Sequence, residues 1–106
     1  MKIGFKEFYI FVCESSKYFG TEVRVYEKEE NAKNAVASIY EEYIINKTYK
    51  PQNENSFQEA KDEYETRNKT GFTLMLDDNE KFGCYYEKAT YADFYYNGKN
   101  NSSLTK

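Results

Sequence analysis

Residues 31–47, NAKNAVASIYEEYIINK, carry the apolar pattern that decides the fold. Apolar side chains recur there three and four residues apart, which is the spacing of one face of an α-helix. The members of this apolar stripe are Ala32, Ala35, Val36, Ile39, Tyr40, Tyr43 and Ile44. The positions on the opposite side are small, polar or charged: Lys33, Asn34, Ser38, Glu41 and Glu42. The pattern predicts one long helix that packs on a core, with Asn31 as its N-cap.

Two strand-like segments, residues 3–13 and 21–28, precede this helix. The first contains an uninterrupted apolar run over residues 8–13, which is typical of a central strand covered on both faces. In the second, Val23 and Val25 alternate with polar neighbours. This alternation predicts a half-exposed strand that runs antiparallel to the first.

A second, shorter helix is predicted from Ser56 to about residue 67, after a polar loop that contains Pro51. Ser56 and Glu59 match the Ser-x-x-Glu pattern of a capping box. Phe57, Ala60 and Tyr64 form a narrow apolar stripe on this segment. We therefore expect a polar helix that packs at one edge of the domain.

Two more strands follow the second helix. Residues 70–76 alternate Phe72, Leu74 and Leu76 with other residues, residues 77–81 are polar and predict a turn, and residues 82–88 form a return strand with Cys84 and Tyr86 on one face. Residues 90–96 fit either a continuation of the sheet or a helical turn.

The order of elements is ββααββ, which predicts an α+β fold. In this fold an antiparallel four- or five-stranded sheet carries one long and one short helix on one face. We expect residues 1–96 to form a single globular domain and residues 97–106 to form a polar, disordered tail.

The longest apolar run of the chain, residues 8–13, is too short for a secretory signal or a membrane span. We therefore expect a cytoplasmic protein that has no membrane partner. Cys13 and Cys84 each lie in a strand-like segment. They form a disulfide only if those strands are neighbours, and in a cytoplasmic chain two reduced, buried thiols are the favoured interpretation.

The residue types needed for common catalytic and metal sites are missing. The chain contains no histidine and only two cysteines, so it cannot build a Ser-His or Cys-His pair, a histidine-containing zinc site or a four-cysteine site. Its five glycines form no phosphate-binding loop. We therefore expect a non-enzymatic protein with no catalytic residues, no metal and no cofactor.

Acidic residues concentrate in the two predicted helices and their connection. Residues 29–66 hold nine acidic and four basic residues, although the whole chain has a net charge of only −3. The helical carboxylates that we expect to share a surface are Glu41, Glu42, Glu59, Asp62, Glu63 and Glu65. Such a surface would attract a protein partner with a basic surface, including as a mimic of nucleic acid. An ordinary solvated helix face is the alternative.

Aromatic residues crowd the last quarter of the chain. Among them, Tyr85, Tyr95 and Tyr96 are candidate anchors for a protein partner or for self-association. The alternative is a binding site for a small ligand or single-stranded nucleic acid, in which these tyrosines stack on bases from the sheet face. Direct nucleic-acid binding is disfavoured because no arginine cluster accompanies the rings.

The sequence thus predicts a small protein-binding module. Lys, Asn, Tyr, Ile and Phe, whose codons are AT-rich, are abundant. We therefore expect a factor from a mobile element of the phage or plasmid type, which inhibits or adapts a host protein.

Overall fold

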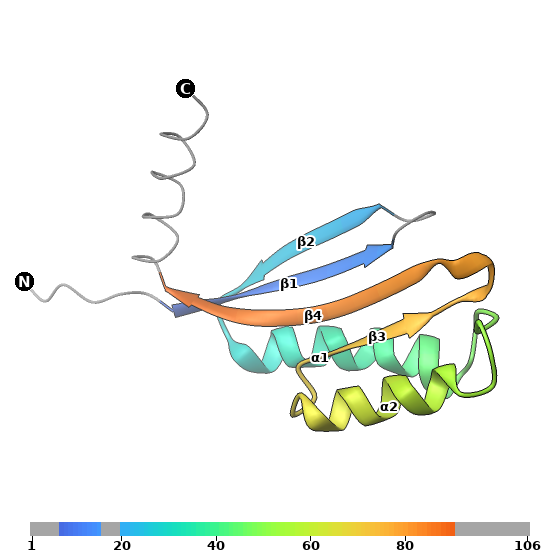
Figure 1. Ribbon diagram of the computed structural model, residues 1–106. Coiled ribbons are helices and arrows are strands. Elements are labelled where there is room, and N and C mark those ends of the chain that lie inside the picture. Colours follow the sequence, from blue (N-terminus) through green and yellow to red (C-terminus); the bar gives the residue numbers. More distant parts are fainter. Residues whose placement is uncertain (1–6, 16–19, 91–106) are drawn as a thin grey trace, which may run out of the picture.

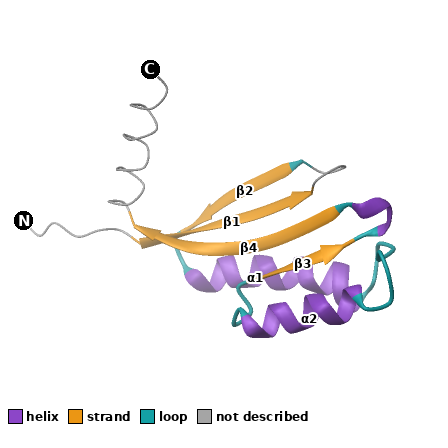
Figure 2. Ribbon diagram, viewed as in Figure 1, coloured by secondary structure: helices purple, strands orange, loops and turns teal. Residues whose placement is uncertain are grey.

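The computed structural model describes residues 7–15 and 20–90 of the 106-residue chain (Figure 1). Its strands are β1 (Glu7–Ser15), β2 (Thr21–Tyr26), β3 (Gly71–Met75) and β4 (Lys81–Thr90). They form one antiparallel sheet in the order β2-β1-β4-β3. The helices α1 (Glu29–Tyr40) and α2 (Ser56–Thr66) pack on the same face of this sheet (Figure 2). The predicted α+β fold is confirmed. The first strand is central, as predicted, but the helices cover only one of its faces.

The long helix begins three residues before the predicted start. Lys28 is the N-cap and makes no side-chain capping bond, so the prediction of Asn31 as N-cap was wrong. Glu29 and Glu30 occupy the first turn instead, where the helix dipole favours negative charge. After Tyr40 the helix continues as one π-helical turn, Glu41–Ile45. The chain leaves the helix near Lys47, which has a φ of 53°.

The predicted stripe of this helix faces the core. Ala32, Val36, Tyr43 and Ile44 are buried. The polar and charged residues on the opposite side of the helix are exposed, as predicted. The Tyr43 ring stacks on the Phe82 ring of β4 with centroids 4.0 Å apart. Buried aromatic rings from the sheet and the helices therefore supply much of the volume that aliphatic residues fill in other cores.

The second helix spans almost the predicted residues, Ser56–Thr66, but its N-cap differs from the predicted one. Asn55 is the N-cap and makes no side-chain capping bond, so the predicted capping box between Ser56 and Glu59 does not form. The Ser56 hydroxyl is buried and instead accepts a hydrogen bond from the Asn53 N–H at 3.2 Å. Ala60 and Tyr64 are buried, so the apolar stripe was predicted correctly.

The β3–β4 hairpin follows the predicted alternation. Phe72, Leu74 and Leu76 are buried, and the chain reverses through a short 3-10 turn, Asp77–Asn79. β4 extends to Thr90, and the predictions for residues 91–96 and 97–106 lie outside the described residues. No helix in the described part of the chain is long and apolar enough to cross a membrane.

The two cysteines lie opposite each other on β1 and β4, so the two strand-like segments are neighbours. Both are free thiols. A hydrogen bond to Cys13 and burial raise the pKa of the Cys84 thiol, which keeps it protonated. Cys84 is therefore a poor candidate for a nucleophile.

Candidate functional site

The helices cover one face of the sheet and leave the other face open. Because side chains alternate along a strand, Tyr9, Phe11 and Cys13 of β1 point toward the helices, whereas Ile10 and Val12 point away from them. We call the second side the open face. No helix or strand of the described residues packs on the open face (Figures 1 and 2).

The middle of the open face is apolar. Ile10 pairs with Val25, and Val12 lies between Val23 on one side and Tyr85 on the other. Val23 and Val25 are 58% and 62% exposed, and the other three are partly buried. Cross-strand neighbours lie about 5 Å apart, so these five side chains form one continuous surface. We call this surface the open-face patch.

Sequence reasoning placed Val23 and Val25 correctly on one face of a half-exposed strand, but the covered face of that strand is the other one. Tyr26 and Arg24 face the helix layer. The Tyr26 ring packs edge-to-face on Phe11 at 6.4 Å, and the Arg24 guanidinium lies 5.8 Å from the same ring. Because Phe11 is committed to the core, the β1–β2 register turns both valines to the open face.

A hollow of about 500 Å³ adjoins the open-face patch and shares Tyr85 with it. Gly83 leaves space in the floor, since a Cβ at that position would meet only the Glu14 side chain, at 3.9 Å. The charged residues that line the hollow are Glu14, Arg67, Lys81 and Glu87. Two cations and two carboxylates make a mixed rim that offers hydrogen bonds to a ligand without favouring an anion.

Tyr85 is held tightly in its place. A Cβ at Gly71 would lie 2.5 Å from the Tyr85 Cβ, so only glycine allows the two strands to approach this closely. The Arg67 guanidinium lies 5.7 Å from the Tyr85 ring centroid, within the range of a cation–π contact. Burial raises the pKa of Tyr85 despite this nearby cation, so the hydroxyl stays neutral and can donate a hydrogen bond.

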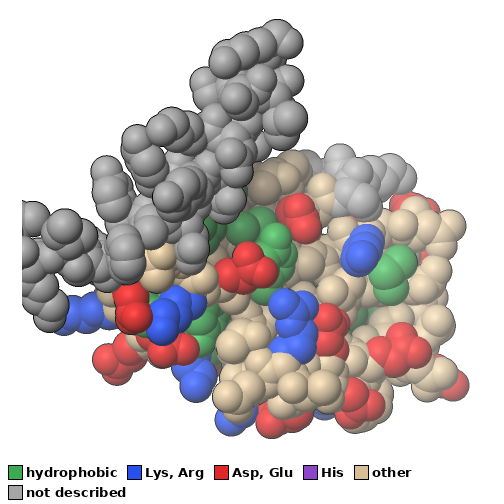
Figure 3. Space-filling model, turned by 60° about the vertical axis from the view of Figure 1, so that its left-hand side comes forward, with side chains coloured by type: hydrophobic (Ala, Val, Ile, Leu, Met, Phe, Trp, Pro, Cys, Tyr) green, Lys and Arg blue, Asp and Glu red, His purple; other side chains and the backbone are tan. Residues whose placement is uncertain are grey.

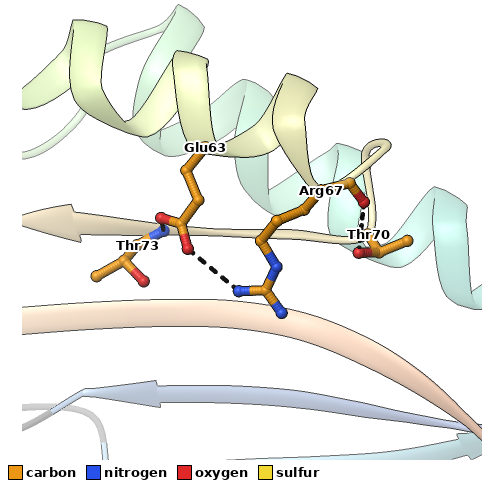
Figure 4. Close-up of polar contacts among 4 residues, drawn as sticks. All are labelled: Glu63, Arg67, Thr70 and Thr73. Carbon is orange, nitrogen blue, oxygen red and sulfur yellow. Dashed lines mark hydrogen bonds and ion pairs between the residues drawn. The ribbon is translucent and has the colours of Figure 1, made fainter.

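Glu63, one of the six predicted acidic-surface residues, is engaged within the fold (Figure 4). Its Oε1 accepts a hydrogen bond from the backbone N–H of Thr73 at 2.7 Å, and its Oε2 accepts one from Arg67 at 3.1 Å. The Arg67 carbonyl in turn accepts the Thr70 hydroxyl at 2.7 Å. Glu63 thus ties α2 to the outer edge of β3.

The other predicted acidic residues are exposed on the helical layer: Glu41, Glu42, Glu59, Asp62 and Glu65. Asp62 accepts a hydrogen bond from its neighbour Gln58 at 2.9 Å. On the side of the molecule that Figure 3 shows, acidic and basic side chains are interspersed. Of the predicted aromatic residues, Tyr85 lies on the open face, and Tyr95 and Tyr96 lie outside the described residues.

Within residues 7–15 and 20–90, no three cysteine, aspartate or glutamate side chains are grouped as a metal site requires. Comparison of the chain with models of protein families, with curated proteins and with solved structures finds no match.

Proposed function

We propose that the chain is a non-enzymatic module that binds a protein partner through the open-face patch. The observation that carries this proposal is the exposure of Val23 and Val25, 58% and 62%, beside Ile10 and Val12 on the same face. Single exposed apolar residues are common, but a continuous apolar surface across neighbouring strands is typical of an interaction site.

Covering the patch would contribute useful binding energy. Removing the exposed parts of Val23 and Val25 from water would stabilise a complex by about 2 kcal/mol at the usual value per unit of apolar area. Tyr85 adds a large ring whose position is already fixed by Gly71 and Arg67. Little side-chain freedom would be lost at this ring on binding, which favours its role as an anchor.

The adjoining hollow gives the partner a place for one protruding side chain. Its mixed rim of Arg67, Lys81, Glu14 and Glu87 would supply hydrogen bonds around the apolar centre. An apolar centre with a polar rim is the usual anatomy of a protein interface. The inhibition or adaptation of a host protein, which was expected of a mobile-element factor, stays a prediction.

The experiment that tests this proposal is affinity capture from a lysate of the source cells with matched bait variants. Val25→Lys places a charge in the open-face patch, and Asn34→Lys places the same charge on the exposed side of α1. A third bait, Glu59→Lys with Asp62→Lys, reverses charge on the predicted acidic surface. We expect a partner that is retained by the wild type, Asn34→Lys and the acidic-surface bait, and lost with Val25→Lys.

A partner that survives Val25→Lys but is lost with the acidic-surface bait would contradict the proposal. That result would assign binding to the helical carboxylates instead. Circular dichroism and thermal unfolding of each bait show whether the loss of a partner reflects the surface or the fold.

A small ligand in the hollow is a second candidate, favoured by one observation. The hollow's volume, about 500 Å³, falls within the range of about 300–1,000 Å³ that is usual for ligand sites. The two carboxylates of its rim, Glu14 and Glu87, offset the two cations, so the hollow offers no net positive charge to the phosphates of a nucleic acid. A single-stranded oligonucleotide titrated at low salt should therefore leave the amide resonances of Gly83 and Thr73 unshifted. Shifts at these amides would favour the stacking alternative over the protein-binding proposal.

A further inference from the structure

The two edges of the sheet differ in how their outward backbone groups are used. At the β3 edge, the Thr73 N–H donates to Glu63, and the Met75 carbonyl accepts a hydrogen bond from the Gln52 N–H at 2.9 Å. Pro51 also forms a bridge with Leu76 just beyond β3. Side chain and loop thus close this edge to any further strand.

β2 forms the opposite edge of the sheet (Figure 1). The Ser15 N–H donates to the Gly20 carbonyl at 2.9 Å, and bonded pairs alternate along an antiparallel ladder. Glu22, Arg24 and Tyr26 therefore direct their backbone groups toward β1, and residues 21, 23 and 25 direct theirs outward. No strand of the described residues pairs with this outward side.

We propose that β2 pairs in antiparallel fashion with β2 of a second copy of this chain, about a two-fold axis beside Val23. In this register, Val23 and the Val23 of the second copy exchange two backbone hydrogen bonds. Thr21 lies opposite the second copy's Val25, and this pair is also hydrogen-bonded. All these donors and acceptors belong to outward residues, and the interface is self-complementary, as two-fold symmetry requires.

The charges of β2 select this register from its neighbours. With the axis at Val23, Glu22 lies opposite the second copy's Arg24, and symmetry repeats the pair. An axis at Glu22 would set two Glu22 carboxylates against each other, and an axis at Arg24 would set two Arg24 guanidinium groups against each other. Opposite charges thus favour one alignment, and like charges oppose the two alignments next to it.

The side chains of Glu22 and Arg24 are suited to forming ion pairs between the two copies. They form an ion pair within one chain and are still 49% and 55% exposed. Both line a hollow of about 320 Å³ between β2 and α1, which gives them room to reorient toward the second copy. The pair carries no net charge, so it does not repel an approaching β2 strand as a row of lysines would.

The paired sheets would form one eight-stranded sheet. Val23 of each copy would lie at the seam, so the two open-face patches would become continuous. The interface uses the edge of the sheet and leaves the open face uncovered. The inference therefore does not rest on the proposed function.

The test is the molar mass of the purified full-length chain, measured by light scattering and sedimentation at low salt. The wild type should approach twice 12.6 kDa as concentration rises. Glu22→Arg alone, or Arg24→Glu alone, replaces two attractive contacts by two repulsive ones. Each should raise the dimer dissociation constant by about tenfold or more. The double variant, with both changes, should restore the wild-type dimer, and an equimolar mixture of the two single variants should form a mixed dimer.

A second variant tests the backbone directly. Val23→Pro removes the outward N–H at the centre of the interface, while the ladder between β1 and β2 keeps its bonds. We expect a folded monomer by circular dichroism and sedimentation.

Three results would overturn the inference. The first is a wild type that stays monomeric up to about 1 mM, which corresponds to negligible affinity. The second is a dimer that persists in both single charge reversals. The third is a double variant that stays as weak as the single ones, which would contradict the Val23-centred register. The charge variants keep the inference testable if Val23→Pro fails to fold.

Discussion

The two faces of the sheet carry similar apolar side chains but differ in what covers them. On the helix-covered face, Phe11 and Phe82 are at most 2% exposed, whereas Val23 and Val25 on the open face are more than half exposed. The two faces of the same sheet therefore contribute to different properties of the protein. The helix-covered face accounts for folding, and we assign the open face to binding.

The largest expected difference between the faces is in stability. Phe82→Ala removes a ring that packs between Tyr43 and Phe72, and should lower the free energy of unfolding by about 3–5 kcal/mol. Val25→Ala on the open face should change it by only about 0.5 kcal/mol. Urea unfolding followed by circular dichroism measures both. Similar losses in the two variants would mean that the open face is covered in solution.

Two glycines on the open face provide a matched pair. Gly71→Ala would force its Cβ against the Tyr85 Cβ at 2.5 Å and the Cys84 carbonyl at 2.8 Å, and should cost about 1–3 kcal/mol of stability. Gly83→Ala adds the same methyl group where the nearest atom is 3.9 Å away, and should cost about 0.5 kcal/mol or less. Unfolding midpoints compare the two variants. Equal midpoints would contradict the close approach of β3 and β4 at Tyr85.

Loss of the hydrogen bonds to Glu63 should have a smaller effect on stability, and this effect should be confined to the β3 edge of the sheet. Glu63→Ala should lower stability by about 1 kcal/mol and speed the hydrogen exchange of the Thr73 amide. Glu63→Gln keeps an oxygen acceptor and should protect that amide better than alanine does. Nuclear magnetic resonance measures the exchange rates. An unchanged Thr73 rate in Glu63→Ala would show that the carboxylate does not close the β3 edge.

The last expected effect is absent at neutral pH and appears only at high pH. Burial and the hydrogen bond from Tyr86 to Glu29, 2.8 Å long, raise the pKa of Tyr86 to about 12. The unfolded tyrosine loses its proton near pH 10. The folded state therefore holds more protons above that pH, and stability should fall between about pH 10 and pH 12. Tyr86→Phe should make this fall shallower in urea titrations, and an equally steep fall would contradict the assigned role of Tyr86.

Much of the fold follows from local patterns in the sequence. The stripe from Ala32 to Ile44 and the alternation at Phe72, Leu74 and Leu76 each settle which residues are buried, since their period matches one element. The helix N-termini were harder to predict. Asn31 and Ser56 are good capping residues by type, but the N-caps are Lys28 and Asn55, and neither makes a side-chain capping bond.

The candidate site was only partly visible in the sequence. Val23 and Val25 show a period of two, which places them on one face without saying whether helices cover that face. Residues 8–13 did indicate this surface, because they make β1 apolar on both faces. The two predicted helices lie on one face and leave the other uncovered. The role of Glu63 depends on a contact with Thr73 ten residues away, and composition alone does not reveal it.

The valine methyl groups report whether solvent reaches the open face. A soluble paramagnetic agent broadens the resonances of methyl groups that water reaches. In the isolated wild-type protein, the methyl resonances of Val23 and Val25 should broaden strongly, and those of the fully buried Val36 should not. Protection of Val23 and Val25 equal to that of Val36 would show that the open face is covered.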